Sequence, residues 1–163
     1  MLKYLSTILV IFFLAGSALP AWSVGIGEPA PDFSLTTLEG GPLELTDFKG
    51  ERPLMLVFWA TWCPICREEV PQIKQIVKQF EPQGLSVVGI NVGINDSPRR
   101  VKAYRDKYAI DYPLAFDKGS RVTRAFGVTG TPTVLILDKQ GIVRYRDAAV
   151  PENLADHFAI LLE

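Results

Sequence analysis

Cysteine and histidine are scarce in this sequence of 163 residues, which holds two cysteines, Cys63 and Cys66, and one histidine, His157. Two cysteines cannot build the dense disulfide framework of a small secreted scaffold, so the fold must depend on a hydrophobic core. Structural zinc sites use about four ligands, mostly cysteine and histidine. The scarcity of both residue types therefore argues against a zinc domain and against any metal cofactor.

An excess of charge of one sign is also missing, because 17 Lys and Arg residues are set against 18 Asp and Glu, for a formal net charge of −1. Without a basic cluster, the chain offers no surface suited to nucleic acid and no polybasic patch for anionic lipid. The contents of 48% hydrophobic and 21% charged residues are those of a globular protein, which excludes disordered, collagen-like and coiled-coil chains. The length fits one domain with an appendage.

The N-terminus has the composition of a targeting segment. Lys3 is the only charged residue among the first 23, and an uncharged apolar run follows over residues 5–19. This order is typical of a secretory signal peptide, here with small residues before a cleavage point at Val24. The alternative is an uncleaved membrane anchor, since the run approaches the ~20 residues that span a bilayer. Either way, we expect residues 1–23 to direct a domain at residues 24–163 to a periplasmic or other extracytoplasmic space.

The apolar pattern of the remaining chain predicts an α/β domain with a mixed central sheet flanked by helices. Unbroken apolar runs indicate strands buried on both faces, and the helices that follow them imply parallel pairing in part. The expected elements are a β-hairpin (33–35 with 43–45), a strand (54–60), a helix from residue 64 kinked at Pro71, a strand (85–91), a helix (98–108) capped by Asp96 or Ser97, a short segment (112–116), a short helix (122–126), an antiparallel pair of strands (133–137 with 142–145) and an amphipathic helix (151–162).

The two cysteines form a Cys-Pro-Ile-Cys motif where the first buried strand gives way to a helix. A thiolate at a helix N-terminus faces unpaired N–H groups and the positive end of the helix dipole, which lowers its pKa. We therefore expect Cys63 to be an exposed nucleophile and Cys66, one turn further on, to be the buried resolving thiol. Pro64 suits the first turn of the helix. The alternatives are an inert disulfide, which would close too short a loop to stabilise much, or half of a zinc site.

Two segments carry a family resemblance: residues 58–66, Phe-Trp-Ala-Thr-Trp-Cys-Pro-Ile-Cys, and residues 130–133, Gly-Thr-Pro-Thr. Together they resemble the thioredoxin superfamily. The N-terminal hairpin, with Pro-Ala-Pro-Asp-Phe at residues 29–33, and an inserted α-β segment after Asn91 resemble its exported TlpA/ResA-like branch, which includes the cytochrome c maturation thioredoxins. The resemblance spans about residues 26–162 and implies a thioredoxin-like fold.

The resemblance also implies a substrate-binding surface around the cysteines. Pro132 matches the proline that follows a cis peptide bond beside the disulfide, an uncommon bond that indicates a purpose. Thr131 would offer its backbone to an extended substrate. Trp62 and Pro64 would shape the exposed surface on which the substrate docks, whereas Trp59 is expected in the core.

Glu69 is the third candidate catalytic residue. Thioredoxin keeps a buried aspartate on the strand before the motif, but the matching residue here is Val57. TlpA/ResA-like proteins instead carry a glutamate three residues after the second cysteine, which is Glu69 in this chain. Spacing of i to i+3 places it on the Cys66 side of the helix, where it could accept the Cys66 proton. The alternative is a solvated surface glutamate like Glu68.

These features predict an exported thiol–disulfide oxidoreductase that needs neither cofactor nor metal. The resemblance favours a monomeric reductase of client proteins, such as apocytochrome c, that takes electrons from a membrane protein of the DsbD/CcdA kind.

A disulfide oxidase or isomerase is the alternative. A thiol peroxidase is more remote, because Thr61 precedes Cys63 by two residues where that motif needs three. A metallochaperone is also more remote, because its C-x-x-x-C spacing is not met. Contact with a membrane is expected only through residues 1–23.

Overall fold

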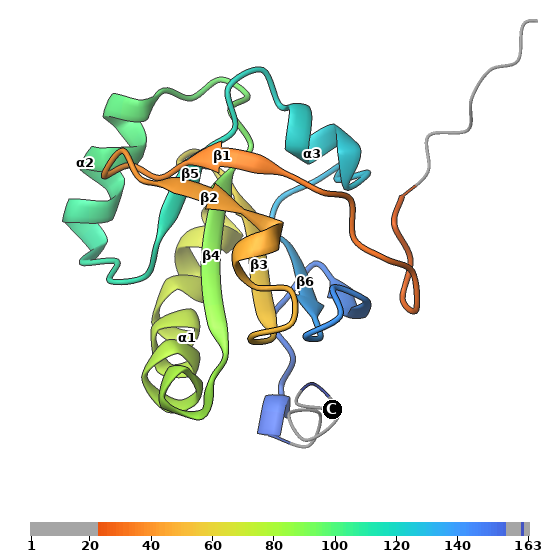
Figure 1. Cartoon of the computed structure of the whole chain (residues 1–163). Coiled ribbons are helices and arrows are strands. Elements are labelled where there is room, and N and C mark those ends of the chain that lie inside the picture. The colour runs from red at the N-terminus through yellow and green to blue at the C-terminus, as the bar shows by residue number, and fades with distance from the viewer. Residues whose placement is uncertain (1–22, 156–160, 162–163) are drawn as a thin grey trace, which may run out of the picture.

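The computed structural model describes residues 23–155 and 161, and its centre is a five-stranded mixed sheet. The strand order is β5-β4-β3-β6-β7, with β3, β4 and β5 parallel and β6 and β7 antiparallel to their neighbours (Figure 1). The elements in chain order are β1 (Ser34–Thr36), β2 (Pro42–Glu44), η1 (Leu45–Asp47), β3 (Leu54–Trp59), α1 (Pro64–Phe80), η2 (Glu81–Gln83), β4 (Ser86–Asn91), α2 (Pro98–Tyr108), β5 (Leu114–Phe116), α3 (Arg121–Ala125), β6 (Thr133–Leu137) and β7 (Val143–Asp147).

Strand β3 forms the middle of this sheet and of the core. All six of its residues are buried, as expected for an apolar strand covered on both faces. It pairs in parallel with β4, Val57 opposite Gly89, and antiparallel with β6, Val57 opposite Val134. Phe58 on β3 packs against Phe126, with ring centroids 5.4 Å apart. The strand that precedes the cysteines is thus buried along its whole length and paired on both sides.

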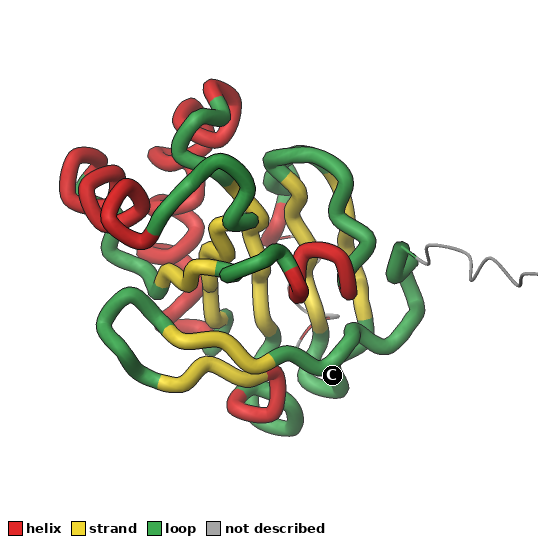
Figure 2. Tube along the Cα trace, turned by 90° about the horizontal axis from the view of Figure 1, so that it is seen from above, coloured by secondary structure: helices red, strands yellow, loops and turns green. Residues whose placement is uncertain are grey.

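The N-terminal hairpin lies outside the main sheet, as a separate two-stranded ribbon (Figure 2). It is attached to the sheet edge, because Thr37 forms an isolated antiparallel bridge with Ala115 of β5. The N–H of Leu38 donates to the carbonyl of Leu114 at 2.9 Å, next to this bridge. Such a cover hides an edge strand that would otherwise expose unpaired backbone groups.

The helices were predicted well where a cap or a proline marks their start. Helix α1 begins at Pro64 and continues through Pro71, burying a stripe that includes Ile73 and Val77. Helix α2 covers the predicted residues and is capped by the Ser97 hydroxyl, which accepts the N–H of Arg100 at 3.3 Å, so Ser97 and not Asp96 is the N-cap. In Figure 1, α1 runs alongside β4, and α2 lies beyond β5.

Two predictions fall on residues that the structure does not describe. The signal peptide or anchor lies almost entirely within residues 1–22, and the C-terminal helix lies partly within residues 156–160 and 162–163, together with His157. Among the described helices, none is long and apolar enough to cross a bilayer.

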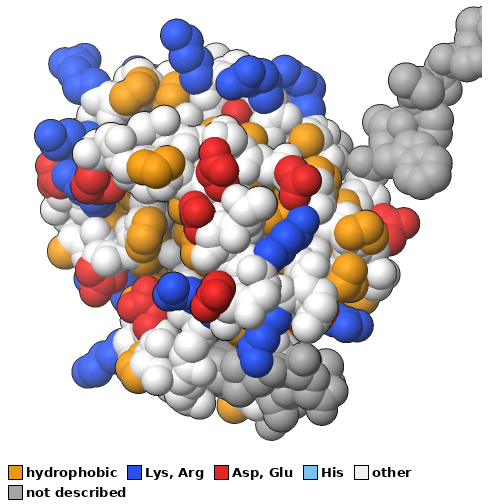
Figure 3. All heavy atoms as spheres, in the orientation of Figure 1, with side chains coloured by type: hydrophobic (Ala, Val, Ile, Leu, Met, Phe, Trp, Pro, Cys, Tyr) orange, Lys and Arg blue, Asp and Glu red, His pale blue; other side chains and the backbone are white. Residues whose placement is uncertain are grey.

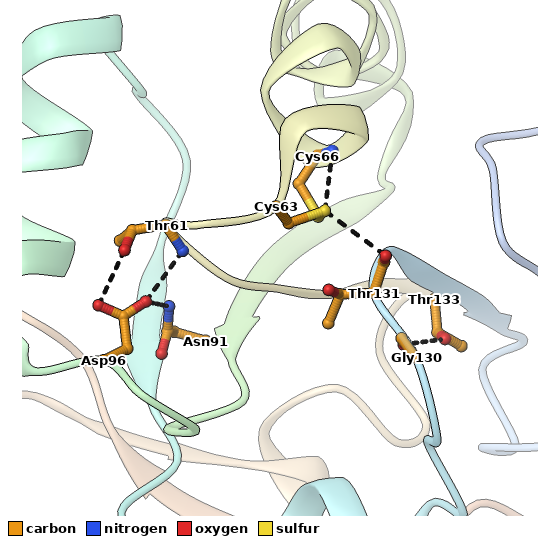
Figure 4. The surroundings of a disulfide bond; sticks show 8 residues. All are labelled: Thr61, Cys63, Cys66, Asn91, Asp96, Gly130, Thr131 and Thr133. Atoms are coloured by element: carbon orange, nitrogen blue, oxygen red, sulfur yellow. Dashed lines mark hydrogen bonds between the residues drawn. A yellow bond between two sulfur atoms is a disulfide. The ribbon is translucent and has the colours of Figure 1, made fainter.

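Asp96 joins the two loops that follow β3 and β4. Its carboxylate accepts the Thr61 N–H at 2.9 Å, the Thr61 hydroxyl at 3.0 Å and the Asn91 side-chain amide at 2.8 Å (Figure 4). Asn91 is fully buried at the end of β4, and Thr61 lies two residues before Cys63. Hydrogen bonds to a charged acceptor are among the stronger ones in proteins. Asp96 therefore fixes the turn from β3 into α1.

Asp96→Ala is expected to lower the free energy of unfolding by about 2 kcal/mol, because it leaves partly buried donors of Thr61 and Asn91 without an acceptor. Urea unfolding of the oxidised protein measures this change. The matched control is Asp106→Ala, whose exposed carboxylate pairs with Arg105 at the surface and should matter by less than about 1 kcal/mol. Equal unfolding midpoints for Asp96→Ala and the parent would contradict the prediction.

Candidate active site

Cys63 and Cys66 form a disulfide bond at the point where the chain leaves β3 and enters α1 (Figure 4). Their Cα atoms are 5.3 Å apart, within the ordinary range for a disulfide. The placement follows from local sequence: the apolar strand ends at Trp59, and Pro64 occupies the first helical turn, where no backbone donor is lost. The pair therefore lies at the carboxyl end of a central strand and at the amino end of a helix.

The expectation that Cys63 is exposed is wrong for this disulfide state. Cys63 and Cys66 are both 4% exposed. The reason is packing: the bond to Cys66 holds the Cys63 Sγ on one side, and the loop at Thr131 approaches it on the other. The N-terminus of α1 exposes Pro64 and Ile65 instead.

Cys63 is the N-cap residue of α1. Its backbone is extended, and its Sγ accepts the N–H of Cys66 at 3.1 Å. This donor is one of the N–H groups that a helix start leaves without an intrahelical partner. The Cys63 Sγ therefore takes the place of the side-chain oxygen that usually caps a helix N-terminus.

The loop before β6 forms the opposite wall of the site. The Thr131–Pro132 peptide bond is cis, which confirms the expectation for Pro132, and Pro132 is buried. The Thr131 carbonyl oxygen lies 3.5 Å from the Cys63 Sγ (Figure 4), close enough to accept a hydrogen bond from a Cys63 thiol after reduction. Because proline has no N–H, the loop presents a carbonyl and no donor from Pro132.

An apolar surface borders the disulfide. Trp62 is 51% exposed, Ile65 58% and Ile94 50%. The Trp62 indole N–H donates to the Ile94 carbonyl at 2.7 Å, which holds the ring against the loop after β4. Large exposed apolar side chains grouped beside a reactive bond suit the docking of another chain. Trp59, by contrast, is buried in the core, as expected.

Glu69 is buried in α1, one turn after Cys66, so the alternative of a solvated surface glutamate is wrong. One of its oxygens, Oε1, accepts the Val150 N–H at 3.3 Å, and Oε2 has no partner among the described residues. Burial raises the pKa of the Glu69 carboxyl above its ordinary value of 4.5, although the Val150 hydrogen bond opposes this shift. Its neighbour Glu68 is exposed. The fold therefore sets apart one carboxyl that can hold or release a proton near the disulfide.

The structure brings Cys63 and Cys66, at the strand-helix turn, together with Thr131 in the loop before β6. It also adds Asp96 to the site, a role that the sequence did not reveal. Asp96 was considered only as a helix cap, yet it binds Thr61 across 35 residues of sequence. No local pattern marks such a pair. Among the described residues, no three of His, Cys, Asp and Glu lie close enough together to hold a metal ion.

Comparison with known proteins gives one family for most of the chain. Residues 26–146 match the model of the AhpC/TSA family. A thiol-disulfide oxidoreductase ResA of Geobacillus thermodenitrificans is 34% identical over 122 residues, which are 75% of this chain and 68% of that protein. A thioredoxin-like protein YneN of Bacillus subtilis is 39% identical over 124 residues, which are 74% of this chain and 71% of that protein.

A solved structure confirms the thioredoxin-like fold predicted from the sequence. A thiol:disulfide interchange protein of the thioredoxin family from Chlorobium tepidum superimposes with a TM-score of 0.69 at 34% identity, covering 84% of this chain and 95% of that one. The disulfide at the start of α1 joins the two cysteines of a Cys-x-x-Cys motif. The chain therefore belongs to the AhpC/TSA family of thioredoxin-like proteins, and it is a thiol–disulfide oxidoreductase.

Proposed function

We propose that this protein reduces disulfide bonds of exported client proteins through the Cys63–Cys66 pair. The observation that carries the direction of exchange is the buried carboxyl of Glu69, one helical turn from Cys66. A negative charge beside a thiol disfavours its thiolate and raises its pKa. Strong disulfide oxidants of this fold have a stabilised reduced form, in which the thiolate is favoured. A carboxylate that disfavours the thiolate destabilises the reduced form, so the protein gives up its electrons more readily and acts as a reductant.

The reaction starts from the dithiol form. The Cys63 thiolate attacks one sulfur of the client disulfide, an S–S bond forms between Cys63 and the client, and the second client sulfur leaves as a thiolate. The Cys66 thiolate then attacks the Cys63 sulfur, which forms the disulfide seen here and releases the other client thiol. The two electrons pass from the enzyme dithiol to the client.

Each step draws on a different wall of the site. The helix start favours the thiolate on Cys63, which makes it the attacking group. Glu69 accepts the proton that Cys66 must lose, since Val57 leaves no carboxylate on the strand. Trp62 and Pro64 form one side of the docking surface, and the Thr131 backbone beside Pro132 forms the other.

The cellular setting is proposed from the resemblance to the TlpA/ResA-like branch. Residues 1–23 would export the domain, either as a cleaved signal peptide or as a membrane anchor. Once the disulfide has formed, a membrane protein of the DsbD/CcdA kind would reduce it again. Apocytochrome c is the proposed client, and the protein acts as a monomer.

The reduction potential tests the direction of exchange. We expect the oxidised protein, equilibrated against dithiothreitol or glutathione, to show a midpoint below about −220 mV, in the range of reductants of this fold. A midpoint near about −120 mV would indicate an oxidase and overturn the proposal.

Peroxide consumption by the dithiol form should be negligible, because the Thr61 hydroxyl is engaged by Asp96.

Cys66→Ser is expected to accumulate mixed disulfides with client proteins, because the thiol that resolves them is missing. Cys63→Ser should accumulate none, because it lacks the attacking thiol. Non-reducing electrophoresis of an exported protein fraction, followed by mass spectrometry of the shifted bands, measures both. Trapping by Cys63→Ser instead of Cys66→Ser would reverse the roles of the two cysteines.

Glu69→Gln is expected to slow disulfide exchange about tenfold or more at neutral pH, because it removes the proton acceptor and retains the shape. In the parent, the rate should fall as the pH drops through the pKa of Glu69, which burial raises above 4.5, and this acid limb should vanish in the variant. Stopped-flow exchange with a disulfide peptide across pH measures both effects.

Two readouts separate this role from a structural one. The Cys66 thiol should titrate at lower pH in Glu69→Gln, because a negative charge has been removed. Because burial raises the pKa of Glu69, the folded parent is destabilised as the pH rises and this buried carboxyl ionises. Glutamine does not ionise, so the stability of Glu69→Gln relative to the parent should increase from acid to neutral pH. The exposed Glu68→Gln is the control and should change neither. Unchanged rates in Glu69→Gln would leave water as the proton acceptor.

A further inference from the structure

A groove leads away from the disulfide between α1 and α2. It consists of two adjoining cavities, of about 260 Å³ and about 440 Å³, that share Arg67 and Tyr108. The first is lined by Thr61, Trp62, Cys63, Pro64, Arg67, Tyr104, Lys107 and Tyr108, and the second adds Val70, Pro71 and Lys74. We call it the cationic groove, because it holds Arg67, Lys74 and Lys107, and none of the described residues that line it is a carboxylate.

Among the described residues, no carboxylate lies within ion-pair distance of the three cations in the cationic groove. Arg67 and Lys107 make no ion pair within the described part of the chain, where Lys49, Arg105 and Arg144 do. Basic and acidic side chains are interspersed over the face shown in Figure 3, so the composition of the groove differs from that of this surface. Unpaired cations grouped beside a reactive bond attract anionic groups.

Two of these cations are held in place, one by an aromatic ring and one by a backbone carbonyl. The Lys107 Nζ lies 5.3 Å from the centroid of the Tyr108 ring, a cation–π contact. The Lys74 Nζ donates to the Ala109 carbonyl at 2.6 Å, which tethers it at the far end of the groove. The hydroxyl of Tyr104, whose side chain is buried, has no hydrogen-bond partner among the described residues and is a further donor without an acceptor.

We propose that the cationic groove binds an acidic side chain of the client, close in sequence to the client cysteine that Cys63 attacks. This inference rests on the proposed function and adds the class of substrate. Arg67 follows Cys63 by four residues on α1, or about 6 Å along the helix axis. An extended client spans that length in about two residues, at about 3.3–3.6 Å each. The groove therefore selects an aspartate or glutamate about two positions from the cysteine.

The test uses synthetic peptides whose single cysteine is blocked as a mixed disulfide with neutral 2-thiopyridine. Attack by Cys63 on the peptide sulfur forms the enzyme–peptide disulfide and releases thiopyridone, which is followed by absorbance; Cys66 then frees the peptide thiol. Matched peptides carry Glu, Gln or Lys two positions before or after the cysteine. The protein is used in its dithiol form and each molecule reacts once, so the measured quantity is the ratio of the second-order rate constants for the Glu and Gln peptides, which cancels any effect of a variant on the thiols themselves.

We expect the Glu peptide to react about fivefold faster than the Gln peptide at low salt, and the Lys peptide to react more slowly than either. The ratio should fall to about one in Arg67→Gln with Lys107→Gln, and also near 1 M salt, where the screening length is about 3 Å. The control is Lys102→Gln with Arg124→Gln, which changes the net charge equally at exposed residues outside both cavities and should retain the ratio.

The outcomes distinguish the two proposals. Equal rates for the Glu and Gln peptides in the parent would overturn the acidic specificity and leave the proposed function standing. A preference that survives in Arg67→Gln with Lys107→Gln, or that disappears in the control pair, would assign it to overall charge and overturn the role of the groove. Absence of thiopyridone release from every peptide would overturn the proposed function, and the specificity with it.

Discussion

The organisation of the site depends on one hydrogen bond, from the Cys66 N–H to the Cys63 Sγ at the start of α1. It requires Cys63 to be the N-cap, which in turn requires the preceding strand to end at a fixed place in the sheet. β3 meets this requirement because it is buried at every position and paired on both sides. The carboxylate of Asp96 then fixes the turn between them from the neighbouring loop. The position of the disulfide is thus set by the central strand of the core.

Two opposing electrostatic influences act within one turn of helix. The helix start places a donor N–H on the Cys63 Sγ, and one turn beyond Cys66 the buried carboxyl of Glu69 has a raised pKa. In the proposed function, this difference between the two cysteines sets the order of reaction and the direction of exchange. The proposed cationic groove adds positive charge between α1 and α2, where it would act on the client instead of on the thiols.

Most of the fold was predictable because its signals are local. The apolar runs of β3 and β6, the prolines at the starts of α1 and α2, and the Cys-Pro-Ile-Cys motif each mark an element from a few adjacent residues. The burial of Cys63 and the contacts of Asp96 were not predictable, because each depends on a loop 35 or more residues away. A catalytic role for Glu69 was expected only through the family resemblance, since helical spacing places it on the Cys66 side of the helix but does not distinguish a buried carboxyl from a solvated one.

The hydrogen bond from Val150 to Glu69 links the redox centre to the segment after β7, 81 residues further along the chain. The surroundings of the Glu69 carboxyl are therefore shared between helix α1 and the C-terminal region. Because the donor is a backbone N–H, a relative with an identical Cys-Pro-Ile-Cys motif but a segment of different length after β7 would lose or displace it. Classification by the motif alone would group two such proteins together, although the hydrogen bonding of the buried glutamate would differ between them.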